Sequence, residues 1–237
     1  MIDHTLVKQT GIHNESCLSF IPKLPDKSLD CVITDPPYGV DFWSRSAVTA
    51  EGKKWVKKIE NDMNLDGALA LFSEVMTSLE SKVKDECDVY VFTRWDIVGA
   101  WIDAIADIPW LKYKMLLVWD KGSPGMGDID SNWGCGHELI LYCKKGLKEV
   151  SYRRSGIIAV DRVASRKAIH PTEKPVPLLE KFVEMSTQPG DVVFDPFSGS
   201  GSTAVACQNT GRIGVGTELD ADHYERSLQR LDQGVLF

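Results

Sequence analysis

The sequence lacks the patterns that mark disulfide scaffolds and zinc proteins. Its six cysteines are scattered along the chain and no two form a Cys-x-x-Cys pair: Cys17, Cys31, Cys87, Cys135, Cys143 and Cys207. Scattered cysteines, several inside apolar segments, are typical of buried free thiols in a reducing compartment. One loose group of Cys135, His137 and Cys143 has no recognised zinc spacing, so we expect no metal site.

Long apolar runs are also missing. No stretch approaches the length that crosses a bilayer, and the first residues, Met1-Ile2-Asp3-His4, lack the basic and apolar regions of a signal peptide. Hydrophobic residues make up 43% of the chain and charged residues 26%, which is ordinary for a globular protein. We therefore expect a cytoplasmic protein with no membrane partner. Its 237 residues suit a single α/β domain spanning 1–237.

A strand that runs into a proline-rich turn is the most informative feature that is present. The apolar residues before Thr34 lead directly to Asp35-Pro36-Pro37-Tyr38. The two prolines fix two φ angles and remove two donors, and Pro36 favours an extended Asp35. The turn therefore presents a carboxylate, a free carbonyl and an aromatic ring at the end of a strand, where α/β sheets bind ligands.

A glycine-rich turn follows a second short strand far downstream. The segment 190–204 reads Gly-Asp-Val-Val-Phe-Asp-Pro-Phe-Ser-Gly-Ser-Gly-Ser-Thr-Ala, and a third strand ends at Glu218. Glycines let the backbone approach a ligand, and the following helix offers free N–H groups. Gly199, Gly201 and Ala204 also fit the G-x-G-x-x-A fingerprint of NAD enzymes, with Glu218 nineteen residues on. The pattern alone leaves an NAD-binding enzyme open.

A third motif, His170-Pro171-Thr172-Glu173-Lys174-Pro175, precedes a helical run. Cations disfavour a helix N-terminus, so Lys174 favours an anionic ligand nearby. A solvated loop lysine is the alternative.

Together these motifs resemble those of the S-adenosylmethionine-dependent DNA amino-methyltransferases, which methylate adenine N6 or cytosine N4. Their order, with the catalytic motif first and the cofactor motif last, resembles the β group of that family. The resemblance implies a Rossmann-like α/β methyltransferase fold, with a mostly parallel sheet, helices on both faces, a β-hairpin at one edge and a circularly permuted motif order. It also implies a target-recognition insertion at about 122–169.

The resemblance assigns roles to the motifs. Asp35, Pro36, Pro37 and Tyr38 are the expected catalytic residues: Asp35 and the Pro36 carbonyl would accept the two N–H groups of the target amine, and Tyr38 would stack on the base. The expected residues for S-adenosylmethionine come from the two downstream motifs: Thr172, Lys174, Asp195, Phe197, Ser198, Gly199, Ser200, Gly201, Thr203 and Glu218. The segments Trp119-Asp120-Lys121 and His137-Glu138 are similar to segments at the edge of the target site, although polar strand ends would look the same.

Aspartate at the first motif position favours adenine, and cytosine N4 is the alternative. A catalytically silent DNA-binding module would keep the same fold, but the intact Asp35 and Tyr38 argue against it.

The net charge of the chain is −7, whereas DNA binding depends on positive charge that neutralises phosphates. From Lys144 to Lys174, however, nine basic residues stand against three acidic ones. Since the distribution matters more than the sum, we expect double-stranded DNA to lie along this segment, with contacts from Arg153, Arg154, Arg166 and Lys167. A solvated charged face is the alternative.

The last residues, Gln233-Gly234-Val235-Leu236-Phe237, resemble the peptide by which bacterial proteins dock on the sliding clamp. Folding back of this tail onto the domain is the alternative, and the chain is expected to be a monomer or a homodimer.

Periodicity predicts the elements between the motifs. Helices are expected over 65–83 and 97–106, and strands over 29–34, 89–93, 115–119, 137–143, 192–194 and 213–217.

Overall fold

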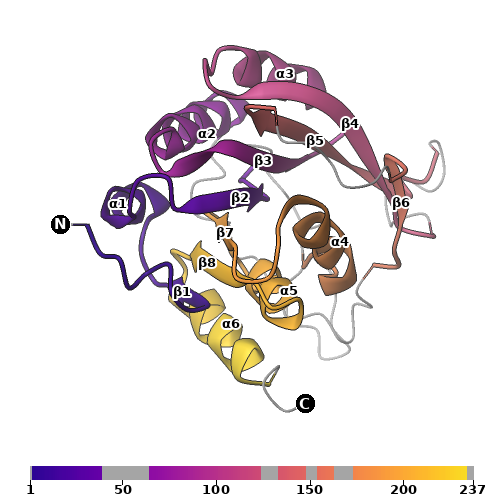
Figure 1. Ribbon diagram of the computed structural model, residues 1–237. Helices are drawn as coiled ribbons and strands as arrows, with labels where there is room; N and C mark the ends of the chain where they lie inside the picture. Colours follow the sequence, from indigo (N-terminus) through magenta and orange to yellow (C-terminus); the bar gives the residue numbers. More distant parts are fainter. Residues whose placement is uncertain (1, 39–63, 124–132, 148–153, 163–172, 234–237) are drawn as a thin grey trace.

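The computed structural model describes residues 2–38, 64–123, 133–147, 154–162 and 173–233. Its centre is an eight-stranded sheet with the strand order β1-β8-β7-β2-β3-β5-β4-β6 (Figure 1). The strands are β1 (Gly11–His13), β2 (Leu29–Thr34), β3 (Val83–Thr93), β4 (Lys112–Asp120), β5 (His137–Lys145), β6 (Ile157–Ala159), β7 (Val192–Asp195) and β8 (Ile213–Thr217). The helices are α1 (Cys17–Phe20), the 3-10 turn η1 (Ile21–Lys23), α2 (Leu65–Leu79), α3 (Val98–Ala106), α4 (Val176–Ser186), α5 (Ser202–Asn209) and α6 (Ala221–Gln233).

The sheet is mostly parallel, as predicted. Every pair from β1 to β3 in the strand order is parallel, and β5 alone runs antiparallel to both of its neighbours, β3 and β4. The expected hairpin is β4–β5. It lies one strand inside the edge, because β6 pairs in parallel with β4, with Trp119 opposite Ile158. Strands β2, β3, β4, β7 and β8 therefore all end at one side of the sheet, which we call the carboxyl edge.

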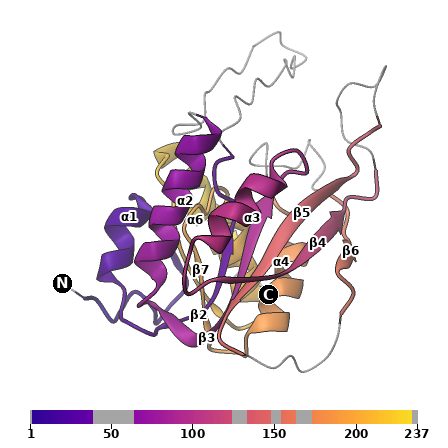
Figure 2. The same ribbon diagram turned by 90° about the horizontal axis from the view of Figure 1, so that it is seen from above.

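Helices cover both faces of the sheet. Successive side chains of β2 point to opposite faces, and both faces are apolar. Val32 faces a cluster built by α1, α2 and α3, with Phe20, Phe72 and Trp101 fully buried. Cys31 and Ile33 face the opposite cluster. Figure 2 shows α1, α2 and α3 beside one another over the first face.

The second face is covered by α4 and α5. Phe182 of α4 lies against Tyr90 of β3, with ring centroids 4.5 Å apart, and Cys207 of α5 is buried in the same cluster. Helix α6 packs on α5 and β1 through Leu231 and Ile12.

Two expected boundaries were wrong by four residues or more. Helix α2 ends at Leu79 rather than at residue 83, because the chain turns there and Val83, the first residue of β3, already pairs with Leu29 of β2. Strand β3 consequently starts six residues before the predicted residue 89. The short strands β1 and β6 were not predicted, since three residues carry too little pattern.

The predicted insertion at 122–169 contributes structure to the sheet itself. It supplies β5, which lies between β3 and β4, and the outermost strand β6. Within the described ranges no helix has the length and apolarity needed to cross a membrane, and no group of three His, Cys, Asp or Glu side chains there could hold a metal ion.

Candidate active site

The two principal motifs meet although they lie 160 residues apart. Strand β7 pairs directly with β2, with Val193 opposite Cys31 and Phe194 opposite Val32. Both strands end at the carboxyl edge, so Asp35 and Asp195 emerge side by side there, near enough for the charge of Asp35 to raise the pKa of Asp195. The parallel pairing therefore builds one site from both motifs.

Asp35 has a partner on each carboxylate oxygen. The Tyr38 hydroxyl donates to Oδ1, and the Lys174 ammonium donates to Oδ2 at 2.5 Å. The Tyr38 ring is held edge-on against Trp101, with centroids 6.4 Å apart. The proline pair between Asp35 and Tyr38 thus folds the motif back so that its carboxylate and phenol meet.

Lys174 lies at the centre of a charged cluster. Its ammonium is 2.5 Å from Asp35 and 2.9 Å from Oε1 of Glu138, and it lies 4.9 Å above the centre of the Phe92 ring. Burial opposes its charge, but the two carboxylates outweigh burial and raise the pKa of Lys174. The lysine is therefore a buried cation, directly before the N-cap Pro175 of α4.

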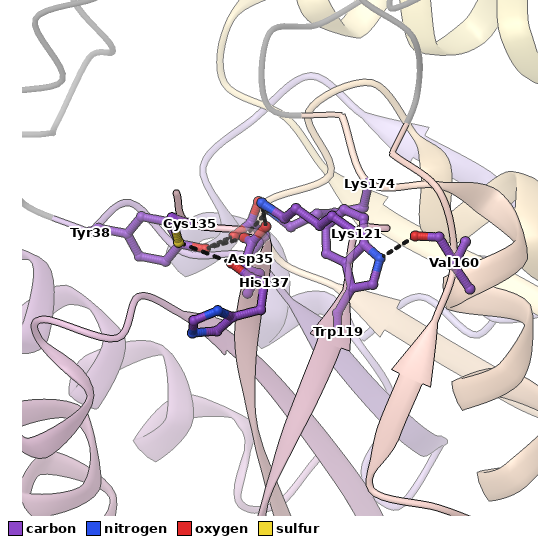
Figure 3. A network of polar contacts seen from close by, with 9 residues as sticks. Asp35, Tyr38, Trp119, Lys121, Cys135, His137, Val160 and Lys174 are labelled. Atoms are coloured by element: carbon purple, nitrogen blue, oxygen red, sulfur yellow. Dashed lines mark hydrogen bonds and ion pairs between the residues drawn. The ribbon is translucent and has the colours of Figure 1, made fainter. Parts of the chain in front are cut away.

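Glu138 and Lys121 complete this cluster. Glu138, in β5, pairs through Oε2 with Lys121 at 2.9 Å, directly after β4. Lys121 also lies over the Trp119 ring at 4.9 Å, and the Trp119 indole donates to the Val160 carbonyl at 2.7 Å. Figure 3 shows Tyr38, Asp35, Lys174 and Lys121 converging at the strand ends.

The charges alternate along the cluster: Asp35, Lys174, Glu138, Lys121. Burial raises the pKa of Asp35; Lys174 opposes that rise and Glu138 adds to it. Burial also acts to raise the pKa of Glu138, but Lys174 and Lys121 outweigh it, and the pKa of Glu138 is lowered. Burial and the two neighbouring carboxylates raise the pKa of Tyr38, so its hydroxyl stays a donor.

Sequence reasoning placed Asp35, Tyr38 and Lys174 in the site. The resemblance placed the segments of Lys121 and Glu138 at the edge of the target site, without giving either side chain a role. The available signal was that Lys121 and Glu138 are polar residues where β4 ends and β5 begins. Their meeting depends on the hairpin register, which places Trp119 opposite Glu138.

The second motif supplies a buried carboxylate. Asp195 accepts from the Thr203 hydroxyl at 2.6 Å and from the Phe197 N–H at 3.1 Å. Burial raises the pKa of Asp195 to about 7, against the effect of these two hydrogen bonds. Asp195 would therefore gain from a cationic ligand, which favours its ionised form.

The glycine-rich loop is shaped by left-handed backbone and by Glu218. Gly201 has φ 75° and caps α5. Gly199 has φ 50°, and beyond its chain neighbours no atom of the described residues lies within 4 Å of a Cβ built there. Glu218 accepts from the N–H of Gly199 at 2.7 Å and from the N–H of Asp220 at 2.8 Å. Glu218 thus fixes the loop while Gly199 leaves open space beside it.

Ser198 and Ser200 are held by the protein. The Ser198 hydroxyl donates to the Asp195 carbonyl at 3.1 Å. Ser200 accepts from Arg230 of α6 at 3.1 Å, and Arg230 also pairs with Glu173 at 2.8 Å. The third motif and the glycine-rich loop are therefore tied together behind the site.

Residues 29–229 match the sequence pattern of a protein family described as DNA methylase. The chain belongs to this DNA methylase family. It is an amino-methyltransferase of the N6/N4 type that acts on DNA, with S-adenosylmethionine as its methyl donor. Membership decides between the two interpretations of the glycine-rich loop, in favour of methyl transfer over NAD chemistry.

Relatives align over nearly the whole DNA methylase chain. It is 25% identical to the DNA adenine methyltransferase YhdJ of Escherichia coli (strain K12), over 94% of this chain and 83% of that protein. It is 26% identical to the type II methyltransferase M2.MboI of Moraxella bovis, over 94% and 88% of the two chains.

Solved structures confirm the predicted Rossmann-like fold. The complex of M1.HpyAVI with SAM superposes with a TM-score of 0.71 at 22% identity, covering 94% of this chain and all of that one. The cytosine-N4-specific PvuII DNA methyltransferase gives a TM-score of 0.72 at 16% identity, covering 94% and 88%.

The residues at the carboxyl edge fit this methyl donor. S-adenosylmethionine carries a sulfonium and an ammonium group, and the buried Asp195 carboxyl would be ionised more readily beside such cations. The open space at Gly199 offers room at the same loop.

Part of the predicted site lies outside the described residues, namely Thr172, Arg153, Arg166 and Lys167. Arg154 is described, and its guanidinium is 3.5 Å from Glu184 of α4.

Proposed function

We propose that this DNA methylase transfers a methyl group from S-adenosylmethionine to the N6 amine of adenine. The main support for adenine is the aspartate at the first position of Asp-Pro-Pro-Tyr, Asp35, which Tyr38 and Lys174 hold at the carboxyl edge. The name of YhdJ, an adenine methyltransferase, supports the proposal. The fold does not discriminate, since a cytosine-N4 enzyme superposes equally well.

The chemical task of the site is to activate a weak nucleophile. The lone pair of an exocyclic amine is delocalised into its ring, and the amine is out of reach until the base is flipped from the duplex. Asp35 and the Pro36 carbonyl would accept the two amine hydrogens and localise the lone pair on nitrogen. Tyr38 would stack on the flipped ring, and Pro37 would keep the turn rigid.

Positive charge develops on the amine as the methyl group moves. A preorganised carboxylate at that point lowers the barrier, because it needs no rearrangement as the charge forms. Asp35 would supply this carboxylate. The methylated amine then releases its proton without a strong base.

S-adenosylmethionine, when bound, supplies an electrophilic methyl group. Residues around the glycine-rich loop and the third motif would hold it: Asp195, Phe197, Ser198, Gly199, Ser200, Gly201, Thr203, Glu218, Thr172 and Lys174. In this arrangement Asp195 would face the cationic part and Glu218 would combine loop support with acceptance from the ribose hydroxyls. Lys174 contacts Asp35 in the structure, so it would have to serve both the cofactor and the target side.

Two further assignments complete the proposal. Segment 122–169 would recognise the target sequence, with DNA phosphates contacted by Arg153, Arg154, Arg166 and Lys167. The tail from Gln233 to Phe237 would dock on a sliding clamp; residues 234–237 of this tail lie outside the described ranges.

A methylation assay tests the proposed function. Unmethylated genomic DNA is incubated with the protein and labelled S-adenosylmethionine, and the nucleosides are separated by mass spectrometry. N6-methyladenine is expected, and Asp35→Ala should abolish its formation while cofactor binding by calorimetry persists. N4-methylcytosine alone would contradict the adenine assignment, and absent labelling with intact cofactor binding would favour a silent module.

A further inference from the structure

The proposed role of Asp35 raises a problem of charge. Its carboxylate should stabilise positive charge on the target amine, yet the Lys174 ammonium lies 2.5 Å from Oδ2. Opposite charges this close largely cancel each other's potential. With Lys174 as its sole charged neighbour, Asp35 would attract a developing cation only weakly.

Glu138 is placed to restore the negative potential. Its Oε1 is 2.9 Å from the Lys174 ammonium, and its side chain is only 13% exposed. Lys121 pairs with the other oxygen of Glu138, but no contact joins Lys121 to Asp35 within the described residues, and its side chain is 23% exposed. The charge of Lys174 is thus shared between two carboxylates, and the cation that offsets Glu138 contacts the other oxygen of that carboxylate, Oε2.

Glu138 is also a second acceptor for Tyr38. The Tyr38 hydroxyl donates to Asp35 and lies 3.4 Å from Oε1 of Glu138. When a target amine takes an oxygen of Asp35, this hydroxyl needs another acceptor, since a buried unpaired donor is costly. A small rotation toward Glu138 provides that acceptor.

We propose that Glu138 is a positioning residue for methyl transfer: it withdraws Lys174 from Asp35 electrostatically and receives the Tyr38 hydroxyl when the target amine binds. This inference rests on the proposed role of Asp35 as the group that meets the amine. It adds a residue of β5, within the segment expected to recognise DNA, to the machinery of the reaction.

The pH behaviour of Asp35 follows from the groups that face it. These are Tyr38 of its own turn, Lys174 before α4, Glu138 of β5 with Lys121 behind it, and Asp195 of β7. Since Glu138 raises the pKa of Asp35 and Lys174 lowers it, Glu138→Gln should move the acid limb of the kcat profile to lower pH. Lys174→Gln should move that limb to higher pH.

The decisive experiment compares two variants at a pH above the acid limb, with saturating cofactor and DNA. Glu138→Gln should lower kcat about tenfold to a hundredfold, less than the 10²–10³ of a group that touches the reacting atoms. The KM for cofactor should not change. The same change is also made in a Lys174→Gln background, where the cation that Glu138 offsets is gone. There Glu138→Gln should lower kcat by a smaller factor than it does when Lys174 is present. An equal loss in the two backgrounds overturns the inference.

A readout without turnover guards against a merely structural role. In protein with carbon-13 aspartate carboxyls and no ligand, Glu138→Gln should lower the NMR titration midpoint of Asp35, assigned through Asp35→Asn. Asp88→Asn, which removes another buried carboxylate, is the matched control and should leave that midpoint in place; an unmoved midpoint in Glu138→Gln contradicts the inference. Failure of the proposed function is separate: Asp35→Asn would then keep its activity, whereas failure of this inference leaves Asp35→Asn inactive and Glu138→Gln unimpaired.

Discussion

Among the described residues, one cluster in the sheet interior and one at the carboxyl edge each join a carboxylate, a tyrosine hydroxyl and a lysine. In the sheet interior, Asp88 accepts from the Tyr142 hydroxyl at 3.0 Å and lies 3.6 Å from the Lys144 ammonium. At the carboxyl edge, Asp35 accepts from Tyr38 and Lys174. Both clusters satisfy their polar groups, so composition alone does not distinguish a structural cluster from a catalytic one.

The difference lies in how the partners are supplied. Tyr142 and Lys144 both come from β5, and Lys144 is directly opposite Asp88 in the ladder, so the register fixes all three. The partners of Asp35 come from its own turn and from the residue before Pro175. The Asp88 side chain is 1% exposed and that of Asp35 is 23% exposed. The edge cluster can therefore exchange a partner for a ligand, whereas the interior one cannot without breaking the sheet.

The largest effect that separates the clusters is expected from Asp35→Asn. An amide cannot supply negative charge to the amine, so kcat should fall at least 10²–10³-fold, the range for loss of one preorganised group. Single-turnover methylation measures this loss, and Asp88→Asn serves as the comparison with unchanged turnover. Equal losses in both variants would break the distinction.

A third buried carboxyl, Asp195, should show itself through pH. Its folded pKa of about 7 lies above the ordinary 3.8, so the folded state keeps a proton that the unfolded state releases. Stability should therefore decline as pH rises from about 4 to about 7, by at most about 4 kcal/mol at 1.36 kcal/mol per pKa unit. Asp195→Asn should remove this decline, measured by urea unfolding at pH 5 and pH 8 without ligand. A decline of the same size in Asp195→Asn would refute the assignment.

Within the interior cluster, Asp88→Asn should act on stability instead of rate. The variant removes the carboxylate charge that lies 3.6 Å from the Lys144 ammonium, at a cost of about 1–3 kcal/mol. Denaturant unfolding would detect the loss as a lower midpoint with an unchanged slope. Unaltered stability would mean that water replaces the carboxylate at Lys144.

The smallest difference between the clusters is expected when the hydroxyl of Tyr142 or of Tyr38 is removed. Tyr142→Phe should cost about 0.5–1.5 kcal/mol of stability, the usual value of one hydrogen bond. Tyr38→Phe keeps the ring for stacking and should lower kcat by a similar free energy, about threefold to tenfold. Tyr38→Ala, which removes the ring as well, should lose a further 1–3 kcal/mol. Equal rates for Tyr38→Phe and Tyr38→Ala would contradict the stacking role.

Much of the fold was predictable because its strands carry strong local patterns. Strands β2, β7 and β8 are short apolar runs. Asp35 directly follows β2, Asp195 is the last residue of β7 and Glu218 directly follows β8, so the local sequence places each carboxylate at a strand end. The partners of Lys174 were not predictable in this way. Glu138 reaches it only through the antiparallel pairing of β5 with β3 and β4, and no local signal encodes that register.

The glycine-rich loop shows the same limit. The sequence indicated that the glycines of the loop let its backbone approach a ligand, and this stays a prediction. The close approach seen is within the protein: a Cβ on Gly216 of β8 would lie 1.9 Å from the Ser198 hydroxyl. The use of Glu218 to hold the N–H of Gly199 was not foreseen. A carboxylate after a strand can serve a ligand or its own loop, and spacing does not separate the two.

The pairing of β2 with β7 has a consequence for synthesis of the protein on the ribosome. Strand β2 finds β3 about 50 residues later, but its other neighbour, β7, is made only at residues 192–195. Until β7 has been synthesised, the side of β2 that pairs with it in the folded protein lacks that partner strand. Unpaired strand edges are prone to aberrant association. The nascent chain carries Asp35 long before it can build the pocket around it, so methylating activity must arise late, when about the last fifth of the polypeptide completes the sheet.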